Sequence, residues 1–187
     1  MLKNVQAELN RFAKYVVKQA RTNLTKGMPT SGTKYSKNDT KVGYNSLKKE
    51  VNVSKNSFQL DFFMEEYLVF QDRGVKGTNS GKSLDNFSYK KSSNLMGVEY
   101  HTGTFAKWAK RKGVQFRNKK GKYVTHEQTG YMLASLIKSR GIKPSMFFTK
   151  PFNKAFERLD KDIVKAFRLD VETLLLTTTK DNLNNGN

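Results

Sequence analysis

The chain has 187 residues, of which 35 are lysine or arginine and 16 are aspartate or glutamate, so its formal net charge is +19. This length suits one domain with a substantial core, and so basic a domain needs an anionic partner such as nucleic acid, a membrane surface or an acidic protein. Because the sequence has no cysteine, it excludes disulfides, thiolate zinc sites and cysteine nucleophiles. The first residues lack the apolar run of a signal peptide, and we expect a soluble protein made inside the cell.

The first third of the chain predicts a long helix followed by a hairpin. Apolar residues at spacings of three and four predict an amphipathic helix over 2–24. The polar, glycine-containing segment that follows has no period and predicts a loop arm at about 25–45. From Leu47 the period changes to two, which predicts two antiparallel strands joined at 54–57. A short helix that ends at Gly74 follows them.

The middle of the chain predicts a second loop arm and two helices. Residues 76–104 are rich in glycine, serine and asparagine and predict the arm. Helices that end at Gly113 and Gly141 are expected on either side of a small basic hairpin, which turns at Lys120 and Gly121.

Two prolines organise the stretch before the last helix. Pro144 disfavours helix just before it, so residues 146–148 are expected to be extended and to pair with the edge of the first hairpin. Pro151 is expected to begin a helix whose Phe152 and Phe156 face the core.

The apolar stripe of this last helix continues to Leu174, either in the same helix or in a second one that starts at Asp160. Residues 177–187 are expected to be a flexible tail. The predicted fold class is α+β, with a long N-terminal helix and further helices packed on a small antiparallel sheet, in a single domain over 1–176.

A search for catalytic chemistry finds only weak signals. The segment GTNSGKS resembles a phosphate-binding loop, but three residues rather than four separate Gly77 from Gly81, and the flanking strand and helix of that motif are missing. His101 and His126 have no partner at a ligand-like spacing. The carboxylates lie most densely at Glu65, Glu66 and Asp72, but acids in the first turn of a helix are common and are a weak sign of a nuclease centre. The sequence therefore predicts no catalytic residue, no metal and no cofactor, and we expect a protein that is not an enzyme.

Basic residues interleaved with aromatic ones give a stronger signal between Trp108 and Tyr123. Such a pattern suits phosphate neutralisation and base stacking. Alternatively the cations form a solvated rim, and helical spacing places Trp108 in the core. The candidate partner-contact or DNA-contact residues are Arg111, Lys112, Arg117, Lys119, Lys120, Lys122, Arg140, Lys143, Lys150 and Lys154.

Three segments, 67–77, 108–114 and 136–175, resemble the tail-completion, or neck, proteins of tailed bacteriophages, especially those of phages and prophages of Bacteroidetes. The third is the longest and the most specific, and the resemblance extends over the N-terminal helix and hairpin to most of the chain. The long segment within 76–104 is the one that does not match clearly.

The resemblance implies a structural virion protein made in the host cytoplasm and located at the junction of neck and tail. It implies a ring homo-oligomer, a head-tail connector that joins the portal to adjacent neck or tail proteins, lines or closes the DNA channel and has no catalytic residues. The basic surface would then face packaged DNA or dock on an acidic neighbour, and docking is favoured because tight DNA binding would oppose ejection. The alternative is a free basic nucleic-acid-binding protein whose hairpin contacts phosphate.

Overall fold

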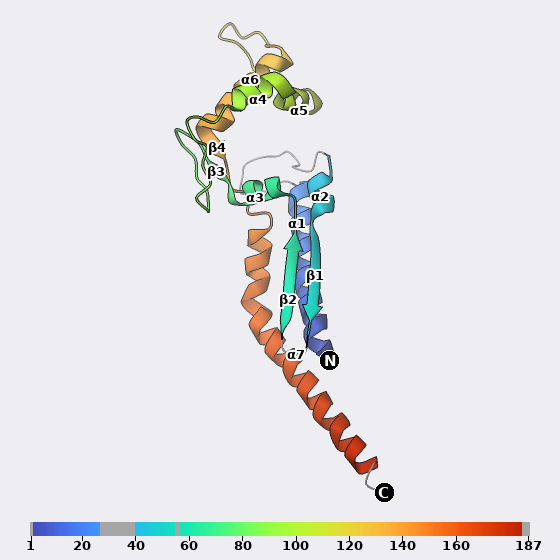
Figure 1. Cartoon of the computed structure of the whole chain (residues 1–187). Coiled ribbons are helices and arrows are strands. Elements are labelled where there is room, and N and C mark those ends of the chain that lie inside the picture. The colour runs from blue at the N-terminus through green and yellow to red at the C-terminus, as the bar shows by residue number, and fades with distance from the viewer. Residues whose placement is uncertain (1, 27–39, 55–56, 185–187) are drawn as a thin grey trace. The chain divides into compact units, whose positions relative to one another are not determined.

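The computed structural model describes residues 2–26, 40–54 and 57–184 and has the predicted α+β fold (Figure 1). By contacts, the chain divides into two compact units. The terminal unit comprises Met1–Leu68 and Met146–Asn187, and the central unit comprises Val69–Ser145. The predicted arm at 25–45 lies largely outside the described residues, apart from a short helix near its end, α2 (Val42–Ser46).

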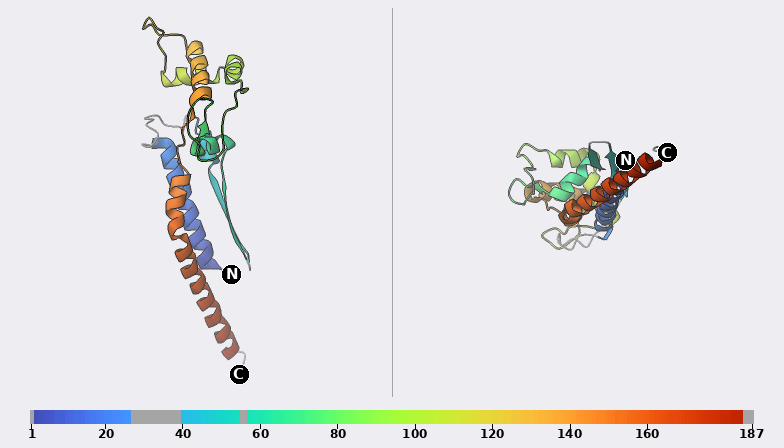
Figure 2. Two further views of the ribbon diagram at one scale, coloured as in Figure 1. Left: turned by 90° about the vertical axis from the view of Figure 1, so that its left-hand side faces the viewer. Right: turned by 90° about the horizontal axis from the view of Figure 1, so that it is seen from below.

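The terminal unit combines two long helices with a two-stranded sheet. The helix α1 packs along α7 and against the hairpin, and Figures 1 and 2 show α1 beside the first half of α7. The strands are antiparallel, with Lys48 opposite Phe63 and Val53 opposite Phe58. These four elements are α1 (Lys3–Lys26), β1 (Lys48–Val53), β2 (Phe58–Phe63) and α7 (Thr149–Asn184).

The core of the terminal unit lies along the predicted apolar face of α1. This face is buried at spacings of three and four from Val5 to Leu24, which confirms the predicted helix. Phe147 is fully buried against the C-terminal half of α1, and the ring of Phe62 meets that of Phe148 edge to face, with centroids 5.2 Å apart.

A carboxylate of α7 caps the first turn of α1. The two oxygens of Asp170 accept hydrogen bonds from the backbone N–H groups of Asn4 and Val5 and from the Asn4 side chain, at 2.9 to 3.1 Å. These backbone donors have no partner inside the helix, so an anion here satisfies them and complements the helix dipole. Burial alone raises the pKa of Asp170, but the hydrogen bonds outweigh it and hold the pKa below its ordinary value.

The last helix differs from its prediction at both ends. Residues 146–148 do not form an edge strand: Met146 has a positive φ of 53°, residues 147 and 148 form a turn, and α7 begins at Thr149, two residues before Pro151. Phe156 does not face the core, because its side chain is 52% exposed. The helix then runs without a break to Asn184, through most of the predicted tail, since no glycine or proline interrupts it after Pro151.

The central unit has three helices and a short two-stranded sheet, and α6 packs on α5 and α4. A fourth helix, α3 (Glu66–Arg73), crosses the boundary between the units and ends at Gly74, whose φ is +77°, as predicted. The remaining elements are β3 (Val75–Lys76), α4 (Leu95–Thr102), α5 (Thr104–Lys112), α6 (His126–Arg140) and β4 (Gly141–Ile142).

The predicted arm at 76–104 is only partly a loop. The helix α4 occupies its end, and buried Glu99 in that helix accepts hydrogen bonds from the N–H groups of Phe105 and Ala106, 2.7 and 2.8 Å away, at the start of α5. The caps of α4 itself are local, since the Asn94 side chain accepts a hydrogen bond from the N–H group of Gly97 and Gly103 ends the helix with a φ of +58°. The glycine, serine and asparagine content of the segment therefore hid a helix whose end signals were present.

Candidate interaction surfaces

The predicted basic hairpin is present and lies in the central unit. Arg117 and Tyr123 form its antiparallel bridge, and the Arg117 guanidinium lies 4.4 Å from the centre of the Tyr123 ring while donating to its hydroxyl at 2.8 Å. The side-chain oxygen of Asn118 accepts from the backbone N–H groups of Lys120 and Lys122, both at 3.0 Å. We call residues 116–124 the basic hairpin; its lysines stand on an exposed turn.

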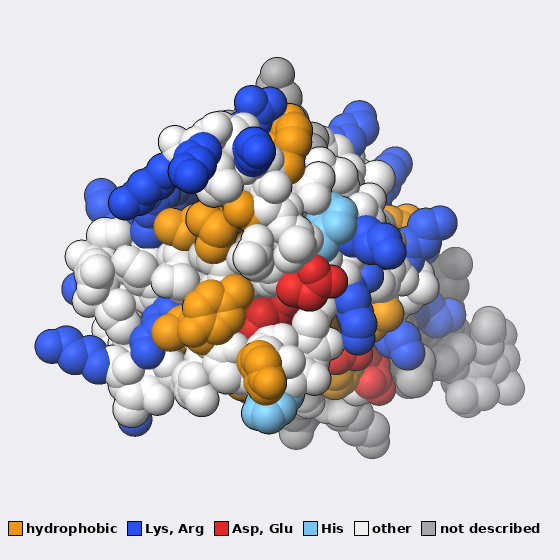
Figure 3. Space-filling model, turned by 90° about the horizontal axis from the view of Figure 1, so that it is seen from above, with side chains coloured by type: hydrophobic (Ala, Val, Ile, Leu, Met, Phe, Trp, Pro, Cys, Tyr) orange, Lys and Arg blue, Asp and Glu red, His pale blue; other side chains and the backbone are white. Residues whose placement is uncertain are grey.

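The ten predicted contact residues do not all belong to one unit. Lys150 and Lys154 lie on α7 in the terminal unit, and the other eight lie in the central unit. All are exposed except Lys112, which is half-buried. Trp108 is also half-buried, so it packs only in part as the core residue that its spacing predicted. On the face in Figure 3, Lys and Arg side chains spread around the surface rather than forming one patch.

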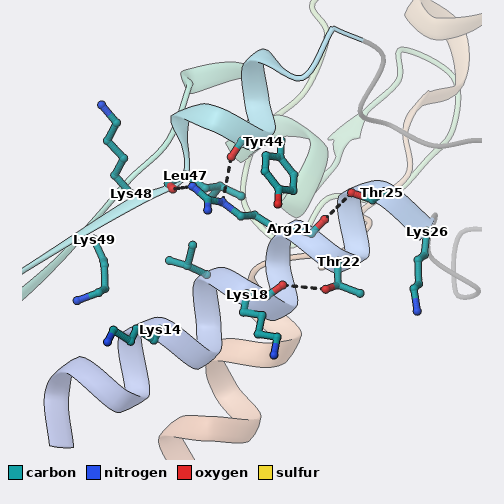
Figure 4. A pocket seen from close by; sticks show the side chains of 11 residues that line it. Lys14, Lys18, Arg21, Thr22, Thr25, Lys26, Tyr44, Leu47, Lys48 and Lys49 are labelled. Carbon is teal, nitrogen blue, oxygen red and sulfur yellow. Dashed lines mark hydrogen bonds between the residues drawn. The ribbon is translucent and has the colours of Figure 1, made fainter. Parts of the chain in front are cut away.

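A second basic surface, which the sequence did not predict, lies in the terminal unit between α1 and the start of β1 (Figure 4). It is a groove of about 740 Å³, and none of the described residues that line it is acidic. We call it the basic groove. Its lining comprises Lys14, Val17, Lys18, Arg21, Thr22, Thr25 and Lys26 of α1, Tyr44 of α2, and Leu47, Lys48 and Lys49.

Arg21 joins the two walls of the basic groove. Its Nε donates to the Tyr44 carbonyl at 3.1 Å and its Nη2 to the Leu47 carbonyl at 2.8 Å, while its guanidinium carbon lies 4.9 Å from the Tyr44 ring centre. The carbonyls of α2 and the segment leading into β1 are thereby held against α1. Arg21 therefore has a structural task as well as a charge.

The lysines of the basic groove are less engaged. Within the described ranges, no carboxylate lies within ion-pair distance of Lys14, Lys18, Lys26 or Lys48. The Lys49 ammonium donates to the side-chain oxygen of Asn10. Among the described residues, the groove thus presents several ammonium groups with no acid within ion-pair distance.

The basic groove was missed because its cations come from two segments that are far apart in the sequence. The lysines of α1 fit the polar face of any amphipathic helix, which is usually solvated. A signal was nevertheless present: α1 carries six Lys or Arg residues and a single acid, Glu8.

An apolar groove of about 830 Å³ lies elsewhere on the terminal unit. Its exposed walls include Phe58, Phe156 and Val164, which are 49%, 52% and 68% exposed. Apart from Asp160, its lining is hydrophobic: Leu9, Phe12, Phe58, Leu60, Phe62, Met64, Phe148, Phe152, Phe156, Leu159, Ile163 and Val164.

The apolar surface continues along α7 beyond the groove. Phe167, Val171 and Leu174 follow Val164 at spacings of three and four and are 48%, 36% and 61% exposed. Because Asp170 caps the N-terminal end of α1, the part of α7 after Asp170 extends beyond that end of α1 (Figure 1). We call Phe156, Val164, Phe167, Val171 and Leu174 the apolar stripe.

In the described part of the chain, no three His, Asp or Glu side chains are grouped as a metal ion requires. The backbone N–H groups of Thr78, Asn79 and Ser80 donate to the carbonyls of Lys138 and Ser139, at the end of α6. The GTNSGKS segment therefore caps a helix with the amides that a phosphate-binding loop would offer to a phosphate.

Comparisons with family models, with curated proteins and with solved structures found no match to this chain. None of the helices in the described ranges combines the length and the apolar character needed to cross a membrane. The geometry itself defines an α+β protein with a basic groove and an exposed apolar stripe on its terminal unit.

Proposed function

We propose that the protein is a non-enzymatic structural subunit of a tailed-phage neck, which assembles as a ring homo-oligomer between the portal and the tail and lines or closes the DNA channel. The phage assignment depends on the resemblance of three segments, of which 136–175 is the most specific. The observation that carries the assembly role is the apolar stripe of α7. Portal, adjacent neck or tail proteins and packaged DNA are the further partners in this proposal.

The apolar stripe favours assembly because it exposes large hydrophobic side chains along one face of a helix. Single exposed hydrophobic residues are common on monomers, but a continuous apolar surface of this kind usually marks a protein interface. In a closed ring each subunit uses two different surfaces, one for each neighbour. The apolar groove and the stripe that continues from it offer hydrophobic area for such contacts.

The charge of α7 also suits contact with a second copy. This helix carries seven Lys or Arg and six Asp or Glu residues, whereas the whole chain carries 35 and 16. Copies of so basic a protein repel one another over most of their surface. The nearly neutral helix that bears the apolar stripe is where repulsion opposes association least.

The oligomeric state of two matched variants tests this role. Phe167 and Leu169 are similarly exposed, at 48% and 46%, but Leu169 lies on the opposite side of α7 from the stripe. We expect light scattering after size exclusion to show an oligomer for the wild type and Leu169→Glu, and a monomer for Phe167→Glu. Equal helix content by circular dichroism would confirm that both variants fold.

A monomeric wild type, or identical behaviour of the two variants, would contradict assembly through the stripe. The phage assignment has its own test, which is electron microscopy of particles. We expect a fixed number of copies between portal and tail, and finding the protein only in the cytoplasm of infected cells would defeat that assignment.

The basic hairpin favours the second candidate, a free nucleic-acid-binding protein. Residues 104–125 hold eight Lys or Arg residues and no acid, and such a run neutralises phosphates. Under this alternative, replacing Lys119, Lys120 and Lys122 with glutamate abolishes DNA affinity. Under the neck proposal, the same variant either fails to assemble or behaves like the wild type.

A further inference from the structure

We infer that the basic groove between α1 and the start of β1 binds the phosphodiester backbone of a nucleic acid. The inference concerns the terminal unit alone and does not require a ring, so it stands or falls separately from the neck proposal. It also assigns binding to residues outside the ten that the sequence singled out.

The first support is the regular spacing of cations along one wall. Lys14, Lys18 and Lys26 lie on the groove side of α1, with Thr22 at the intervening position of the same four-residue step. Four residues of α-helix rise about 6 Å, so the wall from Lys14 to Lys26 is about 18 Å long. A polymer whose charges recur at short, regular intervals meets several ammonium groups of this wall at once.

The opposite wall completes the site. Lys48 and Lys49 line the groove from the β1 side: the Lys49 side chain points toward the lysines of α1, and the Lys48 side chain points outward at the rim (Figure 4). Val17 and Leu47 add apolar residues to the lining. Cations on two walls of a concave surface reinforce one another, because low-dielectric walls concentrate their field.

The kind of cation in the groove is compatible with phosphate. Five of the six cations in the groove are lysines, which act as point charges toward phosphate oxygens. The planar fork of arginine matches carboxylate and phosphate alike, and the fork of Arg21 already donates to two backbone carbonyls. The groove thus offers ammonium charges rather than open arginine forks.

Fluorescence anisotropy of a labelled single strand and a labelled duplex, titrated with the full-length protein, tests the inference. For at least one of them, we expect the logarithm of the binding constant to fall linearly with the logarithm of the salt concentration. Comparison of the single strand with the duplex shows which form of nucleic acid the groove accepts. The triple variant Lys14→Gln/Lys18→Gln/Lys48→Gln should bind at least about tenfold more weakly, with the salt slope reduced by about 2 to 3. All three lysines are exposed, so the variant should keep the wild-type thermal unfolding.

A matched control separates the groove from net charge. Lys82→Gln/Lys90→Gln/Lys91→Gln removes the same three charges from exposed sites in the central unit, and its affinity should fall less than about threefold. In the wild type, a lysine-reactive reagent should label Lys14, Lys18 and Lys48 more slowly once nucleic acid is bound. Lys82 should keep its reactivity.

Three results would overturn the inference. Equal losses in the two triple variants would mean that affinity follows net charge alone. Tighter binding of a polyglutamate chain than of either oligonucleotide, lost in the groove variant, would assign the groove to an acidic protein. Unchanged labelling of the groove lysines in the complex would place nucleic acid elsewhere on the protein.

Discussion

The basic hairpin and the basic groove carry similar residues but present them in opposite ways. The hairpin concentrates its lysines within a few residues and displays them on an exposed turn. The basic groove collects lysines from α1 and β1 around a concave surface. Charge density along a chain therefore does not locate a concave basic surface, because concavity arises from how separate elements pack.

The two regions also differ in what supports them. The groove lining includes Leu47, which is 1% exposed and belongs to the same core cluster as Phe147. The hairpin depends largely on polar contacts around Asn118 and on the stacking of Arg117 over Tyr123. Substitutions at Leu47 should therefore affect the whole terminal unit, whereas substitutions in the turn should act locally.

The largest expected effect is that of Leu47→Ala. Removing this buried side chain should lower the free energy of unfolding of the terminal unit by about 2 to 5 kcal/mol, because a cavity remains between α1 and the start of β1. The counterpart in the hairpin, Tyr123→Ala, removes a side chain that is 63% exposed and should cost less than about 1 kcal/mol.

Urea unfolding measures both variants, provided that the two units are followed by different probes. Far-ultraviolet circular dichroism is dominated by the long helices of the terminal unit. The single tryptophan, Trp108, reports on the central unit. Similar losses for Leu47→Ala and Tyr123→Ala would contradict the distinction between a groove built into a core and a hairpin held locally.

Asp170→Asn should have the next largest effect, because Asp170 holds the start of the helix that forms one wall of the groove. At neutral pH we expect a loss of about 1 to 2 kcal/mol. The pKa of Asp170 is lower in the folded protein than in the unfolded chain, so its charge stabilises the fold above the unfolded value of about 3.9. That contribution is lost as the pH falls through the lowered folded-state pKa.

The difference in unfolding free energy between the wild type and Asp170→Asn should therefore shrink between about pH 5 and pH 2. Chemical unfolding at several pH values within this range measures it. A difference that stays constant with pH would mean that the Asp170 charge does not supply the capping energy.

The hairpin variant Lys119→Gln/Lys120→Gln/Lys122→Gln should weaken nucleic-acid binding by less than about threefold, since solvated charges on a convex turn are screened by salt. The same anisotropy titration as for the groove variant measures it. A larger loss than that of the groove variant would reverse the comparison and support the free nucleic-acid-binding alternative.

Elements whose signals are local could be predicted from the sequence. The helix α6 is an example: Thr125 and Gln128 form a capping box at its start, and Gly141 ends it with a φ of +77°. The basic hairpin also follows from its own turn residues. In contrast, the turn at 146–148 depends on partners elsewhere in the chain, such as Asn23, which donates to the Phe147 carbonyl, and periodicity does not show them.

The interaction surfaces were less predictable for a similar reason. The spacing of Phe167, Val171 and Leu174 indicates an apolar face, but it does not say whether another element covers that face. The answer depends on where α1 begins, and Asp170 fixes that point on α7. The basic groove likewise depends on Arg21, which brings the Tyr44 and Leu47 carbonyls to α1.

The smallest expected effect is that of Asn118→Ala in the hairpin turn. The substitution removes the oxygen that accepts the N–H groups of Lys120 and Lys122, but these groups are exposed and water can replace it. We expect less than about 0.5 kcal/mol of global destabilisation and unchanged nucleic-acid affinity. Hydrogen exchange should become faster at the amides of Lys120 and Lys122 and stay unchanged in α1. Faster exchange in α1 would mean that the turn and the groove are coupled, so that the two basic regions could not be treated as independent surfaces.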